Sequence, residues 1–164
     1  MNIVILGGTG LVGSALQQRL GQKHHVSVYG RSVFESLETL TSHIQGRDLV
    51  IQLAGANIGK RWSKAYKQEL FDSRINTTEL LAQAIQTLEN KPRVFCASAV
   101  GIYPQSNDCS APWDETCTTP GHDFLAELGQ AWEKASLSIE PQPVIFRFGV
   151  VLSPKGGALK EMLP

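Results

Sequence analysis

Residues 3–13 read Ile-Val-Ile-Leu-Gly-Gly-Thr-Gly-Leu-Val-Gly, and this stretch decides the fold class. Four apolar residues typical of a buried strand lead into Gly8, Gly10 and Gly13, which have the spacing G-x-G-x-x-G. Gly7, Gly10 and Gly13 also satisfy the wider spacing G-x-x-G-x-x-G. An apolar stripe with helical spacing begins directly after Gly10. A strand, a glycine-rich turn and an amphipathic helix in this order indicate a dinucleotide-binding fold.

Glycine suits this turn for three separate physical reasons. The chain turns sharply, the backbone must come close to a pyrophosphate, and the helix must pack tightly on the strand. The N-terminus of the following helix presents free N–H groups and the positive end of its dipole to the phosphates. The alternative is a purely structural turn. The strand before the turn and the amphipathic helix after it favour a turn that binds a dinucleotide, and this is our prediction.

Strand-like and helix-like segments alternate along the rest of the chain. Further apolar runs occupy 26–29, 49–53, 94–97 and 144–147, and helical stripes occupy 11–20, 36–44, 80–88 and 124–135. This alternation predicts an α/β fold, a Rossmann-type doubly wound parallel sheet with three α/β/α layers. We expect the strand order 3-2-1-4-5, with the first strand central.

Length and composition fit one folded domain of 164 residues with 42% hydrophobic and 18% charged residues. Fifteen basic and fifteen acidic residues leave no net charge, which argues against nucleic acid or an anionic membrane as a partner. The apolar runs are too short to span a membrane, and no secretory leader is evident, so a cytoplasmic location is expected. Cys96, Cys109 and Cys117 form no CxxC pair, so we expect reduced thiols and no metal site.

The end of the second apolar run bears on the choice of cofactor. NAD-binding sites usually place Asp or Glu there to hold the ribose 2′-hydroxyl, but this chain has Gly30 and Arg31, and no carboxylate before Glu35. A guanidinium pairs with a 2′-phosphate, whereas a carboxylate repels it. We therefore predict NADP(H), with NAD(H) as the less favoured cofactor. The alternative is that Arg31 is simply a solvated surface residue.

Several motifs together resemble the extended short-chain dehydrogenase/reductases, in particular their atypical epimerase-like branch. That branch is often labelled nucleoside-diphosphate-sugar epimerase and sometimes cell-division inhibitor. The pieces, in order along the chain, are GGTGLVG from Gly7, LAGANI from Leu53, RW at 61–62, SRINTTELLAQAI from 73, SAVGIYP from Ser98, WEKA from 132 and RFGVVLSPKGGAL from 147. Their order and spacing make the resemblance specific, although no single piece does.

The resemblance implies further contacts to the cofactor. Leu53, Ala54 and Gly55 would pass its adenosine half, and Glu69 and Arg74 would reach its rim from the next helix. Together with the motif, these assignments give a predicted cofactor site of Gly7, Gly8, Thr9, Gly10, Leu11, Val12, Gly13, Gly30, Arg31, Leu53, Ala54, Gly55, Glu69, Arg74, Ser98 and Val151. For Glu69 and Arg74 the alternative is an ordinary pair of surface side chains.

The chain departs from the family pattern at the catalytic positions. Catalytically active members of the extended family use a Ser or Thr and a Tyr-x-x-x-Lys pair, in which the Lys lowers the pKa of the Tyr. Alignment on residues 132–133 puts Leu125 at the Tyr position and Gly129 at the Lys position. Ser98 and Tyr103 remain as candidate catalytic residues near the expected nicotinamide site. His122 and Asp123 are further titratable candidates, although a helix N-cap is expected for Asp123.

The irregular segment 99–122 leaves the carboxyl end of the fourth run, the edge at which open α/β sheets bind ligands. Relatives continue well beyond the position of Leu159, so we expect 1–164 to be a truncated NAD(P)-binding domain without its C-terminal substrate lobe. Three functions stay open: an NADP(H)-dependent oxidoreductase or epimerase with a small or nucleotide-linked substrate, a non-catalytic NADP(H)-binding sensor or regulator, and a scaffold. A homodimer is also considered.

Overall fold

The computed structural model describes residues 1–105 and 112–159, and its core is one parallel sheet. The strands are β1 Asn2–Leu6, β2 His25–Tyr29, β3 Leu49–Gln52, β4 Arg93–Ala99 and β5 Val144–Phe148. The helices are α1 Leu11–Leu20, α2 Leu37–Ile44, α3 Lys64–Gln86 and α4 Phe124–Ser136, with short 3₁₀ turns η1 Arg31–Phe34 and η2 Val100–Ile102. An antiparallel hairpin follows β5, formed by β6 Leu152–Ser153 and β7 Gly156–Gly157.

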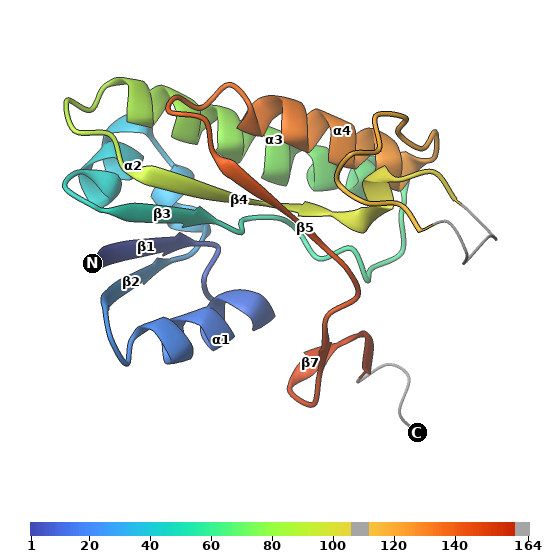
Figure 1. The fold of residues 1–164 in the computed structure, drawn as a ribbon, viewed down its shortest axis with the longest axis horizontal. Helices are drawn as coiled ribbons and strands as arrows, with labels where there is room; N and C mark the ends of the chain where they lie inside the picture. The colour runs from blue at the N-terminus through green and yellow to red at the C-terminus, as the bar shows by residue number, and fades with distance from the viewer. Residues whose placement is uncertain (106–111, 160–164) are drawn as a thin grey trace.

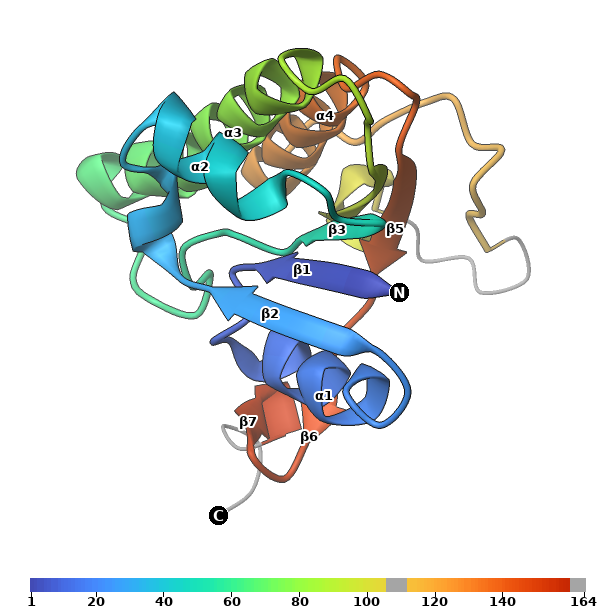
Figure 2. The ribbon, with the colours of Figure 1, turned by 90° about the vertical axis from the view of Figure 1, so that its left-hand side faces the viewer.

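The helices cover the two faces of the sheet unequally. Helix α1 lies on one face, and α2, α3 and α4 lie side by side on the other (Figures 1 and 2). The β6–β7 hairpin lies next to α1 (Figure 2). The predicted α/β fold with three layers is therefore confirmed.

The predicted strand order is wrong. The observed order is β2-β1-β3-β4-β5, so β3 pairs with β1 and β2 forms an edge. All four residues of β3 are buried, whereas no residue of β2 is, and polar His25 and Ser27 suit an edge strand. The chain also crosses from β2 to β3 over the face opposite α1. Crossover connections between parallel strands are right-handed, so connections on opposite faces of the sheet move in opposite directions across it. The connection through α1 places β2 on one side of β1, and the connection through α2 therefore brings β3 to the other side of β1.

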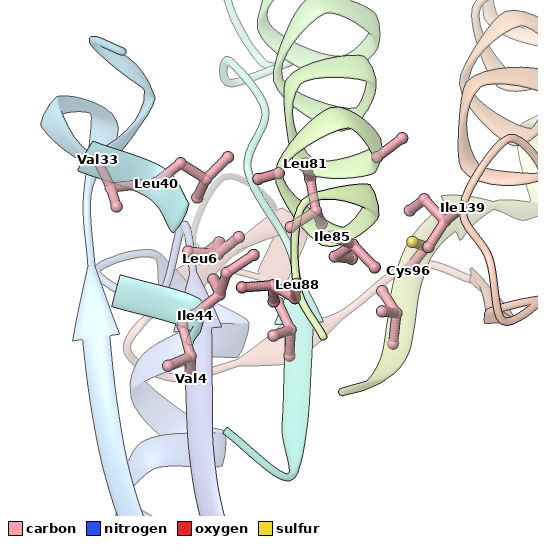
Figure 3. Packing of buried hydrophobic residues seen from close by; sticks show 14 residues of the cluster. Val4, Leu6, Val33, Leu40, Ile44, Leu81, Ile85, Leu88, Cys96 and Ile139 are labelled. Carbon is pink, nitrogen blue, oxygen red and sulfur yellow. The ribbon is translucent and has the colours of Figure 1, made fainter. Parts of the chain in front are cut away.

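Alternating residues of the central strands supply two hydrophobic layers. On the face of α2–α4, Val4, Leu6 and Val50 pack with helix residues such as Leu40 and Ile85 (Figure 3). On the α1 face, Ile3, Ile5, Leu49 and Ile51 pack with Leu16 and Leu20. Burial on both faces explains the nearly continuous apolar runs in the sequence.

Side-chain caps fix where three helices begin. Oγ of Ser36 accepts a hydrogen bond from the N–H of Thr39 at 3.1 Å, and Oγ of Ser63 accepts one from Tyr66 at 3.1 Å. The carboxylate of Asp123 accepts one from Ala126 at 2.9 Å, which confirms its expected N-cap role. Helix α3 begins at Lys64, far earlier than the predicted stripe at 80–88.

The remaining general predictions concern membranes and cysteines. In 1–105 and 112–159, no helix has the length and apolar character needed to cross a bilayer. Cys96 is buried, and burial raises the pKa of its thiol to about 11, so this thiol stays protonated. Cys117 is a free thiol, and Cys109 lies outside the described residues.

Candidate functional site

The glycine-rich turn joins β1 to α1 by close backbone packing. Gly7 has φ +74° and donates a hydrogen bond to the carbonyl of Tyr29 at 2.9 Å. At Gly13 a Cβ would lie 2.3 Å from Cα of Gly8, so the helix touches the turn where no side chain fits. Gly10 is the N-cap of α1, and no side chain caps this end of the helix. The first N–H groups of α1 are thus available to an anion.

A cavity of about 550 Å³ opens beside this turn, and we call it the glycine-loop cavity. It lies at the carboxyl ends of β1, β2 and β3, where ligands bind in open α/β sheets. Of the predicted cofactor residues, it is lined by Gly7, Thr9, Gly10, Gly30, Arg31, Leu53, Ala54, Gly55 and Glu69. Gly8 and Gly13 are buried behind the turn and support it.

A second cavity of about 920 Å³ shares Thr9 and Gly10 with the first and continues between α1 and the β6–β7 hairpin. The predicted residues Leu11, Val12 and Val151 line it. The structure therefore places Val151 beside the glycine turn from the far end of the chain. The two cavities flank the turn, which suits a ligand of two halves joined by a pyrophosphate.

The β3–α3 loop that forms one wall of the glycine-loop cavity is held by two consecutive residues of α3. The N–H of Ala56 donates to Oγ of Ser73 at 2.9 Å, and the Ala56 carbonyl accepts from Nη2 of Arg74 at 3.0 Å. The fully buried amide of Gln52 donates to Oγ1 of Thr77 at 3.3 Å. These contacts fix the loop backbone relative to the helix.

Arg74 lies under this loop rather than on the cavity surface. Its side chain is buried, its Nη1 donates to the Leu70 carbonyl at 3.1 Å, and its guanidinium lies 5.1 Å from the Trp132 ring. Burial lowers the pKa of Arg74 from its usual value. A Cβ on Gly55 would lie 2.9 Å from the guanidinium carbon, so Arg74 packs directly behind a lining residue. Its contact with the rim of the cofactor stays a prediction, and its observed contacts position the loop.

Ser98 and Tyr103 are brought together, but by a network under α4. Oγ of Ser98 donates to Oε1 of Glu133 at 2.6 Å, and Arg147 donates to both carboxylate oxygens of Glu133 at 2.8 Å. Nη1 of Arg147 also donates to the Tyr103 hydroxyl at 2.9 Å. Tyr103, Glu133 and Arg147 line a third cavity of about 440 Å³, which shares no described lining residue with the two cavities at the glycine turn.

The electrostatics of this network favour the ionised pair. Burial alone would raise the pKa of Glu133, but hydrogen bonds from Arg147 and Ser98 and the charge of Arg147 outweigh it, so the pKa is lowered. The same pair raises the pKa of Arg147. The Ser98 hydroxyl therefore donates its hydrogen bond to a carboxylate that stays ionised near neutral pH.

Leu125 and Gly129, the positions at which the resemblance predicts Tyr and Lys, lie where α4 packs on η2. A Cβ on Gly101 would lie 3.4 Å from Cβ of Leu125, and a Cβ on Gly129 would lie 3.2 Å from Cβ of Ile102. Gly129 is buried. A side chain at 129 would therefore contact Ile102 more tightly than usual, and η2 would have to shift by a few tenths of an ångström to accept it.

Several residues of the glycine-loop cavity are missing from the sequence prediction. They are Phe34, Ala65, Gln68, Asp72, Ser73 and Thr77, and all but Phe34 come from residues 65–77 of α3. Steps of three and four between these small and polar residues are the signal that could have revealed them. Among the described residues, no group of three or more His, Cys, Asp or Glu side chains is placed to hold a metal ion.

Comparison with known proteins identifies the family. Residues 3–124 match the model of the NAD dependent epimerase/dehydratase family. An epimerase family protein of Staphylococcus saprophyticus is 38% identical over 97% of this chain, and the chain spans 58% of that protein's length.

Solved structures agree with this match. A human epimerase family protein crystallised with NADPH has a TM-score of 0.81 at 31% identity, covering 99% of this chain and 58% of its own. A nucleoside-diphosphate sugar epimerase from Corynebacterium glutamicum has a TM-score of 0.81 at 27% identity, covering 99% of this chain and 36% of its own. The resemblance seen in the sequence is thus confirmed, and the chain belongs to the NAD dependent epimerase/dehydratase family.

Proposed function

We propose that residues 1–164 form the NADP(H)-binding domain of an oxidoreductase or epimerase-like protein whose substrate is small or nucleotide-linked. The observation that carries the proposal is the glycine turn with its uncapped helix end, which opens onto a cavity lined by Arg31. The human family member crystallised with NADPH supports it by analogy. The adenosine half of the dinucleotide would lie in the glycine-loop cavity, and the other half would extend past Thr9 and Gly10 towards Val151.

Arg31 is the residue that would select the phosphorylated cofactor. Its side chain is 82% exposed at the end of β2, and Gly30 beside it leaves open space. One guanidinium–phosphate contact contributes about 1.5–3 kcal/mol, which corresponds to about a 10- to 150-fold preference.

The test is a titration of NADPH and NADH by calorimetry with wild type and Arg31→Ala. We expect wild type to bind NADPH more tightly, and we expect Arg31→Ala to lose most of that difference while it keeps NADH affinity. Equal wild-type affinities would contradict the preference, and no binding of either nucleotide would contradict the function itself.

Chemistry at the bound cofactor is the second part of the proposal. Hydride transfer is supplied by the nicotinamide and depends mainly on positioning. Ser98 and Tyr103 stay candidate catalytic residues, although their hydroxyls contact Glu133 and Arg147. Loss of NADPH absorbance against carbonyl and sugar-nucleotide panels, with Tyr103→Phe as the comparison, is the measurement. General acid–base catalysis raises a reaction rate by about 10²–10⁴-fold, so an unchanged rate in Tyr103→Phe would exclude Tyr103 as the general acid or base.

A non-catalytic NADP(H)-binding module is the second candidate function. It is favoured by the packing of Leu125 and Gly129 against η2, at the positions where the catalytic pair of the relatives is expected. Turnover on any substrate would exclude it. Both candidates predict the same dinucleotide site and neither requires nucleic acid, a membrane or a metal. That the protein forms a homodimer stays a prediction, and analytical ultracentrifugation would test it.

A further inference from the structure

An ion pair crosses the glycine-loop cavity and joins two segments far apart in the sequence. Nη2 of Arg31, which follows β2, lies 3.6 Å from Oε1 of Glu69 on α3. Both residues line the cavity, so the group proposed to bind a 2′-phosphate already faces an anion of the protein.

This pair is weak enough to open when a ligand arrives. The two side chains are 82% and 45% exposed, and 3.6 Å is longer than a hydrogen bond. Exposed pairs of this kind contribute little to folding. A phosphate can therefore take Arg31 from Glu69 without disturbing the fold.

The other charged group in the cavity does not relieve this competition. Arg31 is the one cation among the described lining residues, and the acids are Glu69 and Asp72. Asp72 accepts a hydrogen bond from the Gln68 amide at 2.8 Å and forms no ion pair with Arg31 in the described structure. Two carboxylates thus face a site with a single counter-charge.

We propose that Glu69 is a specificity-determining residue that limits the preference for NADP(H), because a 2′-phosphate must displace its carboxylate from Arg31. A ribose 2′-hydroxyl carries no charge and can donate a hydrogen bond to the same carboxylate. The ratio of the two affinities is therefore set jointly by Arg31 after β2 and by Glu69 on α3. This inference rests on the proposed dinucleotide function.

The experiment uses two ligands that differ only in the 2′-phosphate, namely adenosine 2′,5′-bisphosphate and adenosine 5′-monophosphate. Calorimetry on the full chain compares wild type, Glu69→Gln and Glu79→Gln. We expect Glu69→Gln to tighten the bisphosphate by about five- to fiftyfold, with little change for the monophosphate. Glu79→Gln is the matched control, since it makes the same substitution at an exposed position of the same helix outside the cavity lining, and we expect it to change the affinity ratio less than threefold.

A double variant tests whether Glu69 acts through Arg31. In Arg31→Ala, the further change Glu69→Gln is expected to lose most of its effect on the bisphosphate. An unchanged ratio in Glu69→Gln, an equal effect of Glu79→Gln, or a full effect without Arg31 would each overturn the inference and leave dinucleotide binding intact. If wild type binds neither ligand and neither NADPH nor NADH, the proposed function fails together with the inference.

Discussion

At the scale of single residues, Glu133 connects α4 to two strands of the sheet through side-chain hydrogen bonds. It receives hydrogen bonds from Ser98 on β4 and Arg147 on β5, and these two residues are register partners in the sheet. Its side chain is 11% exposed and that of Arg147 is 24% exposed. Removal of one partner of such a pair leaves the other charge poorly solvated.

We expect Glu133→Gln to lower the free energy of unfolding at pH 7 by about 2–3 kcal/mol. The folded-state pKa of Glu133 lies below its ordinary value of 4.5, so its contribution is present above that value and is lost as the pH falls through the folded-state pKa. Urea unfolding at pH 7 and pH 3.5 should show a smaller loss of stability on acidification in the variant. Parallel losses in both proteins would show that other carboxylates, such as Asp123, dominate.

Two glycines of the same turn have separable roles. A Cβ at Gly13 would meet the Gly8 backbone at 2.3 Å, whereas one at Gly10 would meet the Gly7 carbonyl at an ordinary 3.5 Å. We expect Gly13→Ala to lose about 1–3 kcal/mol of folding stability. Gly10→Ala should keep its melting temperature and lose nucleotide affinity, because its methyl group occupies the approach of the pyrophosphate. Thermal unfolding and calorimetry on both variants check this, and equal melting temperatures would contradict it.

At the scale of elements, the close contact between α4 and η2 limits which side chains fit at positions 125 and 129 of the helix. Gly129 fits against Ile102 and Leu125 fits against Gly101. The sequence predicts the helix correctly because Phe124, Leu128 and Trp132 form a clear stripe. It does not predict this close contact, because two glycines in a helix and a turn give no periodic signal.

We expect Gly129→Lys to destabilise the protein by about 1–3 kcal/mol, since the new side chain must displace η2. Glu127→Lys introduces the same residue at an exposed position of the same helix, and its cost should stay within about 1 kcal/mol. Chemical denaturation of the two variants is the measurement. Equal stabilities would mean that η2 yields easily and that position 129 could accept a lysine.

Only part of the glycine-loop cavity can be predicted from sequence patterns. The glycine turn, Arg31 and the residues after β3 were predicted because each follows a strand directly. Residues 65–77 of α3 are not predicted, because one face of this part of the helix lines the cavity with small and polar residues. Its apolar residues, such as Leu70 and Ile75, pack in a separate hydrophobic cluster and do not mark the cavity face. An amphipathic pattern predicts only the part of a helix that packs on the sheet.

At the scale of the whole molecule, strand order could not be predicted from alternation alone. The alternation predicts helices on both faces, and that is confirmed. Which edge of β1 receives β3 depends on the face over which α2 crosses. The apolar run of β3 indicates a central strand, because a central strand is covered on both faces and paired on both sides. The polar residues of β2 indicate an edge strand.

Hydrogen–deuterium exchange can check this order. We expect amides of β3, which pair with both β1 and β4, to exchange far more slowly than those of the edge strand β2. Peptides covering 49–52 and 25–29 supply the comparison within one sample. Faster exchange in β3 than in β2 would favour the order in which β3 is the edge.

Helix α3 spans two environments with one continuous backbone. Residues between 65 and 77 line the glycine-loop cavity, and further along the helix Leu81 and Ile85 lie in the main core. At 23 residues it is about 35 Å long. Occupancy of the cavity and cohesion of the core are therefore thermodynamically linked. A nucleotide at a hundred times its dissociation constant would add about 2.7 kcal/mol to the free energy of unfolding, so the concentration of that nucleotide would also govern how long this chain survives proteolysis.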